Sequence, residues 1–120
     1  MSDISYQTLP LLDEPALDEL KDMLGDALVE ISDSFLEGLD AEVAAIEGAL
    51  TNGGVSLKAA AHSLKGSAGN LGARRLAGLS SAIEKAAMDG RTADCQILVP
   101  GLRAVALVTR EAIGLYMSQP

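Results

Sequence analysis

The sequence predicts an all-α protein, an antiparallel up-and-down four-helix bundle with one short additional helix near the N-terminus. Apolar residues recur three and four positions apart over long stretches, which is the period of an amphipathic helix, and no stretch alternates as a strand does. The connections between these stretches are short, and short connections between long helices favour antiparallel neighbours. The chain has 120 residues, which is enough for one domain with its own core.

Residues 1–12 carry no clear period, so we expect an extended lead-in followed by a helical domain over residues 13–118. Asp13 is the expected N-cap of a short first helix, with Pro15 in its first turn and Gly25 at its end. Asp26 is the expected cap of a long second helix that stops at residues 52–54. The apolar stripe expected to be buried on that helix comprises Leu28, Ile31, Phe35, Leu39, Val43, Ile46 and Leu50.

A third helix is expected over residues 57–71, with Ser56 as its cap. Its buried stripe comprises Leu57, Ala61, Leu64, Ala68 and Leu71. His62, the single histidine, lies about 140° from the centre of this stripe by helical arithmetic, so its imidazole is expected to face solvent. The residues that share its side of the helix are Lys58, Lys65, Gly66 and Gly69.

Gly72 suits a left-handed turn between the third helix and a fourth over residues 73–88. The fourth helix is expected to bury Leu76, Leu79, Ile83 and Ala86 or Ala87, and small residues at Ala77 and Ser80 would allow a close approach to its neighbour.

Thr92 is the expected cap of a final helix, which Pro100 should kink or break without changing the phase of the apolar pattern. The residues expected to be buried there are Ile97, Leu98, Leu102, Val105, Val108, Ala112 and Leu115.

The composition argues against several function classes. The net charge of −8 disfavours nucleic acid and anionic membrane as main partners, and with one phenylalanine and no tryptophan there is little to stack on bases. Cys95 is the only cysteine, so we expect no disulfide framework and no thiolate metal cluster, and we interpret it as a small buried residue. We find no signal peptide or membrane span and therefore expect a cytoplasmic protein. Separately, we expect the protein to be a monomer.

A neutral imidazole is a good nucleophile at physiological pH, and a carboxylate that accepts one ring N–H would fix the tautomer in which the other nitrogen attacks. Glu84, on the adjacent helix, is the candidate for this orienting role, although hairpin counting places His62 opposite about residue 81. The alternative interpretation of Glu84 is a solvated surface acid. Ser67 could hydrogen-bond near a bound group or to its own helix. No ATP site is apparent, so neither kinase nor phosphatase activity of the chain's own is expected, and no cofactor.

The run from His62 through Lys65, Gly66 and Gly69 to Ala73, continued by Leu76, Leu79, Ile83 and Glu84, closely resembles the signature of histidine-containing phosphotransfer (HPt) domains. These domains are the helical-bundle intermediates of multi-step phosphorelays. The resemblance implies that His62 accepts a phosphoryl group from the phospho-aspartate of one receiver domain and passes it to another. It also implies that the receiver supplies the magnesium ion and that a hybrid sensor histidine kinase stands upstream.

The resemblance assigns Lys65 to offset the charge of the phosphoryl group. Lys58, Gly66, Ser67 and Gly69 are the residues expected to meet a docked partner, since the glycines leave the backbone accessible. Two other functions remain open at this point. The chain could be the phospho-accepting domain of a chemotaxis-type histidine kinase, or a non-catalytic helical adaptor in which His62 is incidental.

Overall fold

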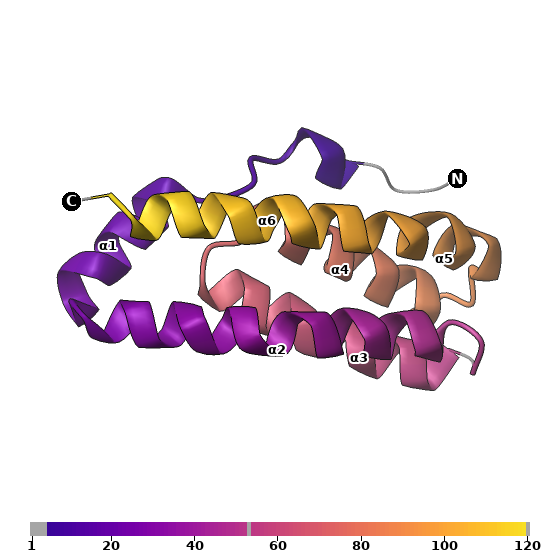
Figure 1. The fold of residues 1–120 in the computed structure, drawn as a ribbon. Helices are drawn as coiled ribbons and strands as arrows, with labels where there is room; N and C mark the ends of the chain where they lie inside the picture. The colour runs from indigo at the N-terminus through magenta and orange to yellow at the C-terminus, as the bar shows by residue number, and fades with distance from the viewer. Residues whose placement is uncertain (1–4, 53, 120) are drawn as a thin grey trace.

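The structure, a computed structural model, describes residues 5–52 and 54–119, and most of these residues are helical (Figure 1). The elements in chain order are η1 (Ser5–Thr8), α1 (Glu14–Leu24), α2 (Ala27–Ala49), α3 (Gly54–Asn70), α4 (Arg74–Met88), α5 (Thr92–Leu98), η2 (Val99–Gly101) and α6 (Leu102–Met117). The expected all-α class is confirmed, and over the described residues the chain forms six α-helices and two 3₁₀ turns.

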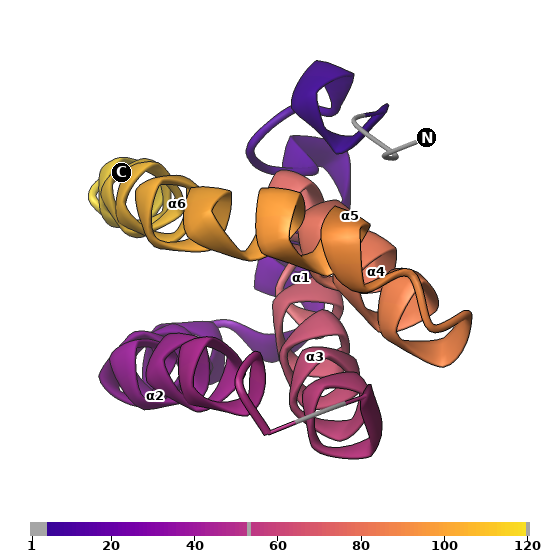
Figure 2. The ribbon, with the colours of Figure 1, turned by 90° about the vertical axis from the view of Figure 1, so that its right-hand side faces the viewer.

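The long helices lie side by side along the 44 Å axis of the molecule, and α1 lies at one end (Figures 1 and 2). α3 packs between α2 and α4, most extensively against α4, while α6 contacts both α2 and α4. α3 and α4 therefore share one side of the molecule and α6 lies away from it, as the end-on view in Figure 2 shows.

The apolar stripe of α3 is buried as expected, with each of its five residues at most 3% exposed. On α2 the expected stripe is buried at Leu28, Phe35, Leu39, Val43 and Ile46, but Ile31 is 46% exposed. Ser32 takes the inward position instead. The prediction for Ile31 was wrong because residues three and four apart both fit a helical stripe, and only the neighbouring helices decide between them.

The helix ends match the sequence in part. Asp13 caps α1, since its Oδ1 accepts the Ala16 N–H at 3.2 Å, and Gly72 is left-handed with φ +73°. Asp26 makes no capping hydrogen bond through its side chain. Ser56 lies inside α3, which begins at Gly54, and Thr92 is the first residue of α5 rather than its cap.

The N-terminal lead-in is not simply extended, because Ser5–Thr8 form the 3₁₀ turn η1 and Tyr6 is buried. This segment lies against α4, where a Cβ built on Gly78 would come within 2.5 Å of Leu9 Cδ1. The Arg75 Nε–H donates to the Leu9 carbonyl at 2.9 Å. The absence of a side chain at Gly78 thus lets the lead-in pack closely on the helix. Residues 1–4 of the expected lead-in lie outside the described residues.

Pro100 interrupts the final helix through the 3₁₀ turn η2, and the buried face that follows is displaced by one residue from the expected one. Leu98 and Leu102 are buried as expected, whereas Ile97, Val108 and Leu115 are exposed. The inward residues after Leu102 are Ala106, Thr109, Ile113 and Tyr116. Apolar residues lie on two sides of α6, so the apolar period of its sequence did not identify which side is buried.

Two buried polar residues of α6 are satisfied internally. The Thr109 hydroxyl donates to the Val105 carbonyl at 2.7 Å, and the Tyr116 hydroxyl donates to Asp18 at 2.6 Å.

Across residues 5–52 and 54–119, no helix has both the length and the apolarity that a membrane crossing requires.

Candidate functional site

His62 lies midway along α3 with its side chain 68% exposed. It points away from the core because the residues one position before it and two positions after it, Ala61 and Leu64, occupy the buried stripe. The expectation of a solvent-facing imidazole is confirmed.

Glu84 reaches this imidazole from α4. Its Oε2 lies 2.5 Å from His62 Nδ1, and Glu84 as a whole is only 8% exposed. Glu84 is therefore a buried, hydrogen-bonded residue and not the solvated surface acid of the alternative interpretation. The close packing of α3 on α4 brings the two side chains together across the interface between these helices.

Lys65 contacts the same carboxylate. Its Nζ donates to Glu84 Oε1 at 2.7 Å, so each oxygen of Glu84 has one partner from α3. The hydrogen bond from Lys65 is the main cause that holds the pKa of Glu84 below its ordinary value, and the bond to His62 adds to it against the opposing effect of burial. Lys65 thus lies beside the histidine, as the sequence indicated, and is held there by a carboxylate.

This geometry assigns a role to each ring nitrogen. An ionised carboxylate only accepts hydrogen bonds, so the His62–Glu84 contact requires the proton on Nδ1. In the neutral ring Nε2 then carries the lone pair, and with the side chain largely exposed it is available to an electrophile from outside. The hydrogen bond to Glu84 thus fixes the tautomer in which Nε2 can act as a nucleophile.

A second carboxylate lies on the opposite side of α3 and was missed by the sequence analysis. Glu42 of α2 accepts hydrogen bonds from Ser67 at 3.2 Å and from Ser63, the residue after the histidine, at 3.4 Å. The Ser67 hydroxyl also lies 3.3 Å from the Leu64 carbonyl of its own helix. Glu42 follows Ala41 and precedes a buried valine, and no sequence signal marks which α2 acid faces α3.

The remaining predicted site residues line the exposed surface of α3. Lys58 is exposed one turn before the histidine. A Cβ added at Gly66 or at Gly69 would meet nothing within 4 Å outside the helix backbone. The space above both glycines is therefore open to another molecule.

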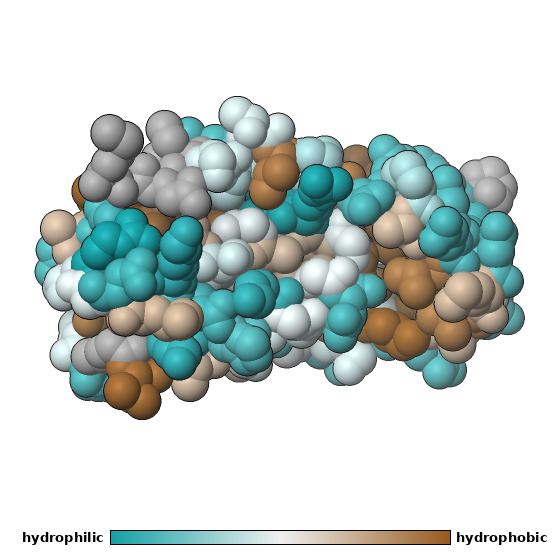
Figure 3. Space-filling model, turned by 180° about the vertical axis from the view of Figure 1, so that it is seen from behind, coloured by the Kyte–Doolittle hydropathy of each residue, from teal (hydrophilic) through white to brown (hydrophobic). Residues whose placement is uncertain are grey.

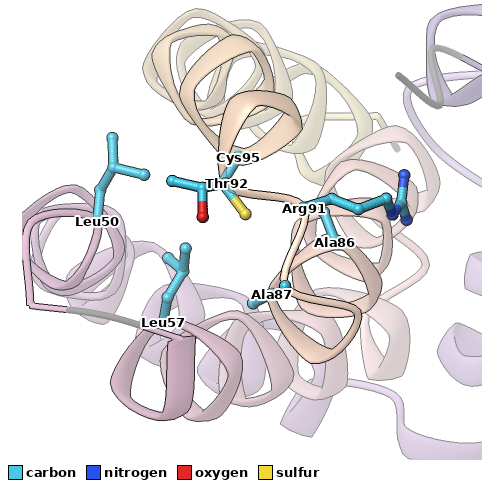
Figure 4. A pocket seen from close by; sticks show the side chains of 8 residues that line it. Leu50, Leu57, Ala86, Ala87, Arg91, Thr92 and Cys95 are labelled. Atoms are coloured by element: carbon cyan, nitrogen blue, oxygen red, sulfur yellow. The ribbon is translucent and has the colours of Figure 1, made fainter. Parts of the chain in front are cut away.

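A separate hollow lies near the N-terminal end of α3, and the histidine does not line it. About 120 Å³ in volume, it lies among the ends of α2, α3 and α4 and the start of α5, and its walls are mainly apolar (Figure 4). Cys95 lines it and is buried, as the sequence predicted, and burial raises the pKa of its thiol. In the part of the chain that the structure describes, no three His, Cys, Asp or Glu residues come together in a way that could hold a metal ion.

Comparison with known proteins agrees with this site. The family model described as the Hpt domain matches residues 30–112, which is more than half of the chain. The fold is similar to the crystal structure of histidine-containing phosphotransfer protein B (HptB) from Pseudomonas aeruginosa, with a TM-score of 0.83 and 25% sequence identity over 91% of this chain and 96% of that chain. No curated protein matches the chain. With the matched residues spanning the exposed histidine and both carboxylates around it, the chain belongs to the Hpt domain family and is a histidine phosphotransfer protein of phosphorelay signalling.

Proposed function

We propose that His62 is the phospho-acceptor and that it shuttles a phosphoryl group between two receiver domains. The observation that carries the proposal is the Nδ1 contact to Glu84 at 2.5 Å, which leaves Nε2 as the exposed nucleophile. Nε2 attacks the phosphorus atom of an aspartyl phosphate, the P–O bond to the aspartate breaks, and the aspartate leaves as a carboxylate. The reverse step returns the group to a second receiver.

Glu84 acts on the histidine before and during this step. While phosphorus bonds to Nε2, the imidazole gains positive charge, and a carboxylate hydrogen-bonded to Nδ1 stabilises that charge. We assign Glu84 this orienting role because it is buried and anchored from a second helix. Lys65 offsets the charge of the phosphoryl group in this proposal, and its side chain is 38% exposed beside the histidine.

The receiver supplies the magnesium ion and most of the catalytic groups in this scheme, and a hybrid sensor histidine kinase is the upstream source of phosphate. Lys58, Gly66, Ser67 and Gly69 lie within the docking surface. For the bundle, we count α2, α3, α4 and the α5–η2–α6 segment as its four helices and α1 as the additional short one. We also propose that the protein acts as a cytoplasmic monomer.

The test is phosphotransfer from a labelled receiver in the presence of magnesium. The wild-type protein should take up acid-labile, alkali-stable label, and His62→Gln should take up none. If both proteins stay unlabelled with every receiver of the cell but an ATP-binding kinase domain labels the wild type, the chemotaxis-type alternative is correct. If neither donor labels the wild type, the protein is a helical adaptor and the proposal is wrong.

A further inference from the structure

α6 carries a second apolar stripe, on the side away from α2. It comprises Val105, Val108, Ala112 and Leu115, which are spaced three, four and three residues apart like the seam of a coiled coil. Arg103 and Arg110 hydrogen-bond to α2 and so mark the side of α6 that faces it, and helical arithmetic places the stripe about 170° from them. Val108 is 38% and Leu115 is 70% exposed, so the bundle leaves much of this stripe open to solvent.

The lead-in before α1 turns one end of this stripe into a groove. Between the lead-in and α6 lies a hollow of about 440 Å³, which Leu11 and Leu12 line from one side and Ala112 and Leu115 from the other (Figure 1). The Arg74 N–H at the start of α4 donates to the Leu11 carbonyl at 3.0 Å, so the wall that the lead-in forms is attached to the bundle. The groove is therefore preformed.

Three carboxylates of α1 border this groove. Glu14 lines it, and Asp18 and Asp22 follow at intervals of four residues on the same side of α1. Tyr116 also lines the groove, and its hydroxyl donates to Asp18 at 2.6 Å. This hydrogen bond, burial and the negative charges of the three carboxylates raise the pKa of Tyr116 to about 12, which shows that all three charges act at the groove.

The charge around the groove is negative overall. Glu111 adds a fourth exposed carboxylate from α6, and against these four stand Lys21 of α1 and Arg75 of α4. The Arg75 Nε–H already donates to the Leu9 carbonyl. Since the whole chain has a net charge of −8, the groove repels an anionic partner such as a second copy of this chain, and it attracts a basic one.

We propose that this groove binds an amphipathic helix of a partner protein, which packs apolar residues on the α6 stripe and places basic residues next to the surrounding carboxylates. A helix that binds in a groove presents its anchors three and four residues apart, which is also the spacing of the residues in the stripe. Exposed apolar side chains with polar groups around them are typical of such contacts.

A helix bound in this groove leaves the histidine accessible. α6 lies away from the side of the molecule that α3 and α4 share, as Figure 2 shows. Figure 3 views that shared side, from behind the view of Figure 1, and shows hydrophilic residues over much of it and apolar residues gathered at the end where α1 lies. A partner held by α6 can therefore tether the protein without covering His62.

Two fluorescent helical peptides of three heptads serve as probes. Both have leucine at the a and d positions, and the flanking e and g positions are lysine in one peptide and glutamate in the other. We expect the lysine peptide to bind the wild-type protein about tenfold or more tightly than the glutamate peptide, as measured by fluorescence anisotropy.

The chain provides matched controls for both parts of the groove. Leu107 is 58% exposed on α6 but lines a different hollow, together with Arg103 and Arg110. We expect Leu115→Ser to raise the Kd of the lysine peptide about tenfold and Leu107→Ser to change it less than twofold, with equal melting temperatures. Glu14→Gln should raise this Kd about threefold, and Glu37→Gln, the same change on α2, should have a smaller effect.

The single histidine reports where the peptide binds. The ring NMR signals of His62 should not shift when the lysine peptide saturates the wild-type protein. Four results would overturn the proposal: equal binding of the two peptides, equal effects of the two serine variants, a shift of the His62 signals on binding, and a wild-type dimer in sedimentation that Leu115→Ser dissociates. None of these measurements uses phosphotransfer, so the proposed function stands or falls separately.

Discussion

Gly66 offers a test in which stability and function should move in opposite directions. It lies inside α3 one turn after the histidine, with an ordinary helical φ, and a Cβ there would meet nothing within 4 Å. In the free protein an alanine would thus fit without strain. Alanine is more favourable than glycine inside a helix by about 1 kcal/mol, so Gly66→Ala should stabilise the fold by about that amount.

For a chain of this length, 1 kcal/mol corresponds to a rise of about 4 °C in Tm. A partner whose backbone or bulky group approaches the bare helix next to the histidine meets the new methyl group. We therefore expect phosphotransfer from a receiver to fall by about tenfold or more, since small displacements of the reacting atoms have effects of this size. The assays are a thermal melt by circular dichroism and the initial rate of label transfer.

Gly114 is the matched control. It is exposed inside α6, has the same open space around its Cβ position, and lies on a helix away from the side that α3 and α4 share. Gly114→Ala should raise Tm by a similar amount and leave transfer unchanged. A Gly66→Ala protein that transfers at the wild-type rate, or a Gly114→Ala protein that is equally impaired, would refute the reasoning.

Three further predictions concern the contacts around the site and the core. Glu84→Gln should slow label uptake about tenfold or more. Because the pKa of Glu84 is lowered, its carboxylate stays ionised in weak acid, so the difference in uptake rate between wild type and variant should persist from pH 8 to pH 5 and shrink only at lower pH, which a pH series of uptake rates would show. Tyr116→Phe should lower the free energy of unfolding by about 1 kcal/mol, as measured in urea melts at pH 7. In the wild type the hydrogen bond to Asp18 raises the pKa of Tyr116 from 10.0 to about 12. Its free energy of unfolding should therefore fall as the pH rises from 10 to 12, because the tyrosine loses its proton in the unfolded state first. Gly78→Ala should destabilise the wild type through its clash with Leu9 but stabilise a Leu9→Ala background by about 1 kcal/mol, so equal effects in the two backgrounds would rule out the contact.

The orientation of α3 could be predicted from sequence because one apolar stripe defines it. Helical arithmetic placed the histidine outside, and the five stripe residues are buried. The partner on α4 was harder to predict. Counting through the turn placed residue 81 opposite His62, whereas the structure brings Glu84 there. The three-residue connection from Leu71 to Ala73 and the crossing angle of the two helices set that offset, and neither can be read from the apolar period of either helix.

Two other features had no usable sequence signal for a similar reason. α2 carries acids all along its length, and which of them faces α3 depends on how the helix is rotated in the bundle, so Glu42 was missed. On α6 a second apolar side competes with the buried one, and the internal hydrogen bonds of Thr109 and Tyr116 favour the less apolar side. Periodicity finds a helix, but it selects a face only where the other faces are polar.

The hydrogen bonds around α3 explain how its backbone can be left bare at Gly66 and Gly69 and still hold the histidine in place. Two glycines cost about 2 kcal/mol of helix stability relative to alanine. Hydrogen bonds to charged groups are worth about 1.5 to 3 kcal/mol each where they are well shielded, and less at the surface. Lys65 bonds to Glu84 on one side, and two serines bond to Glu42 on the other. These bonds attach the helix to α4 and α2 along its flanks, so the contacts that restore its rigidity leave the surface above the histidine open.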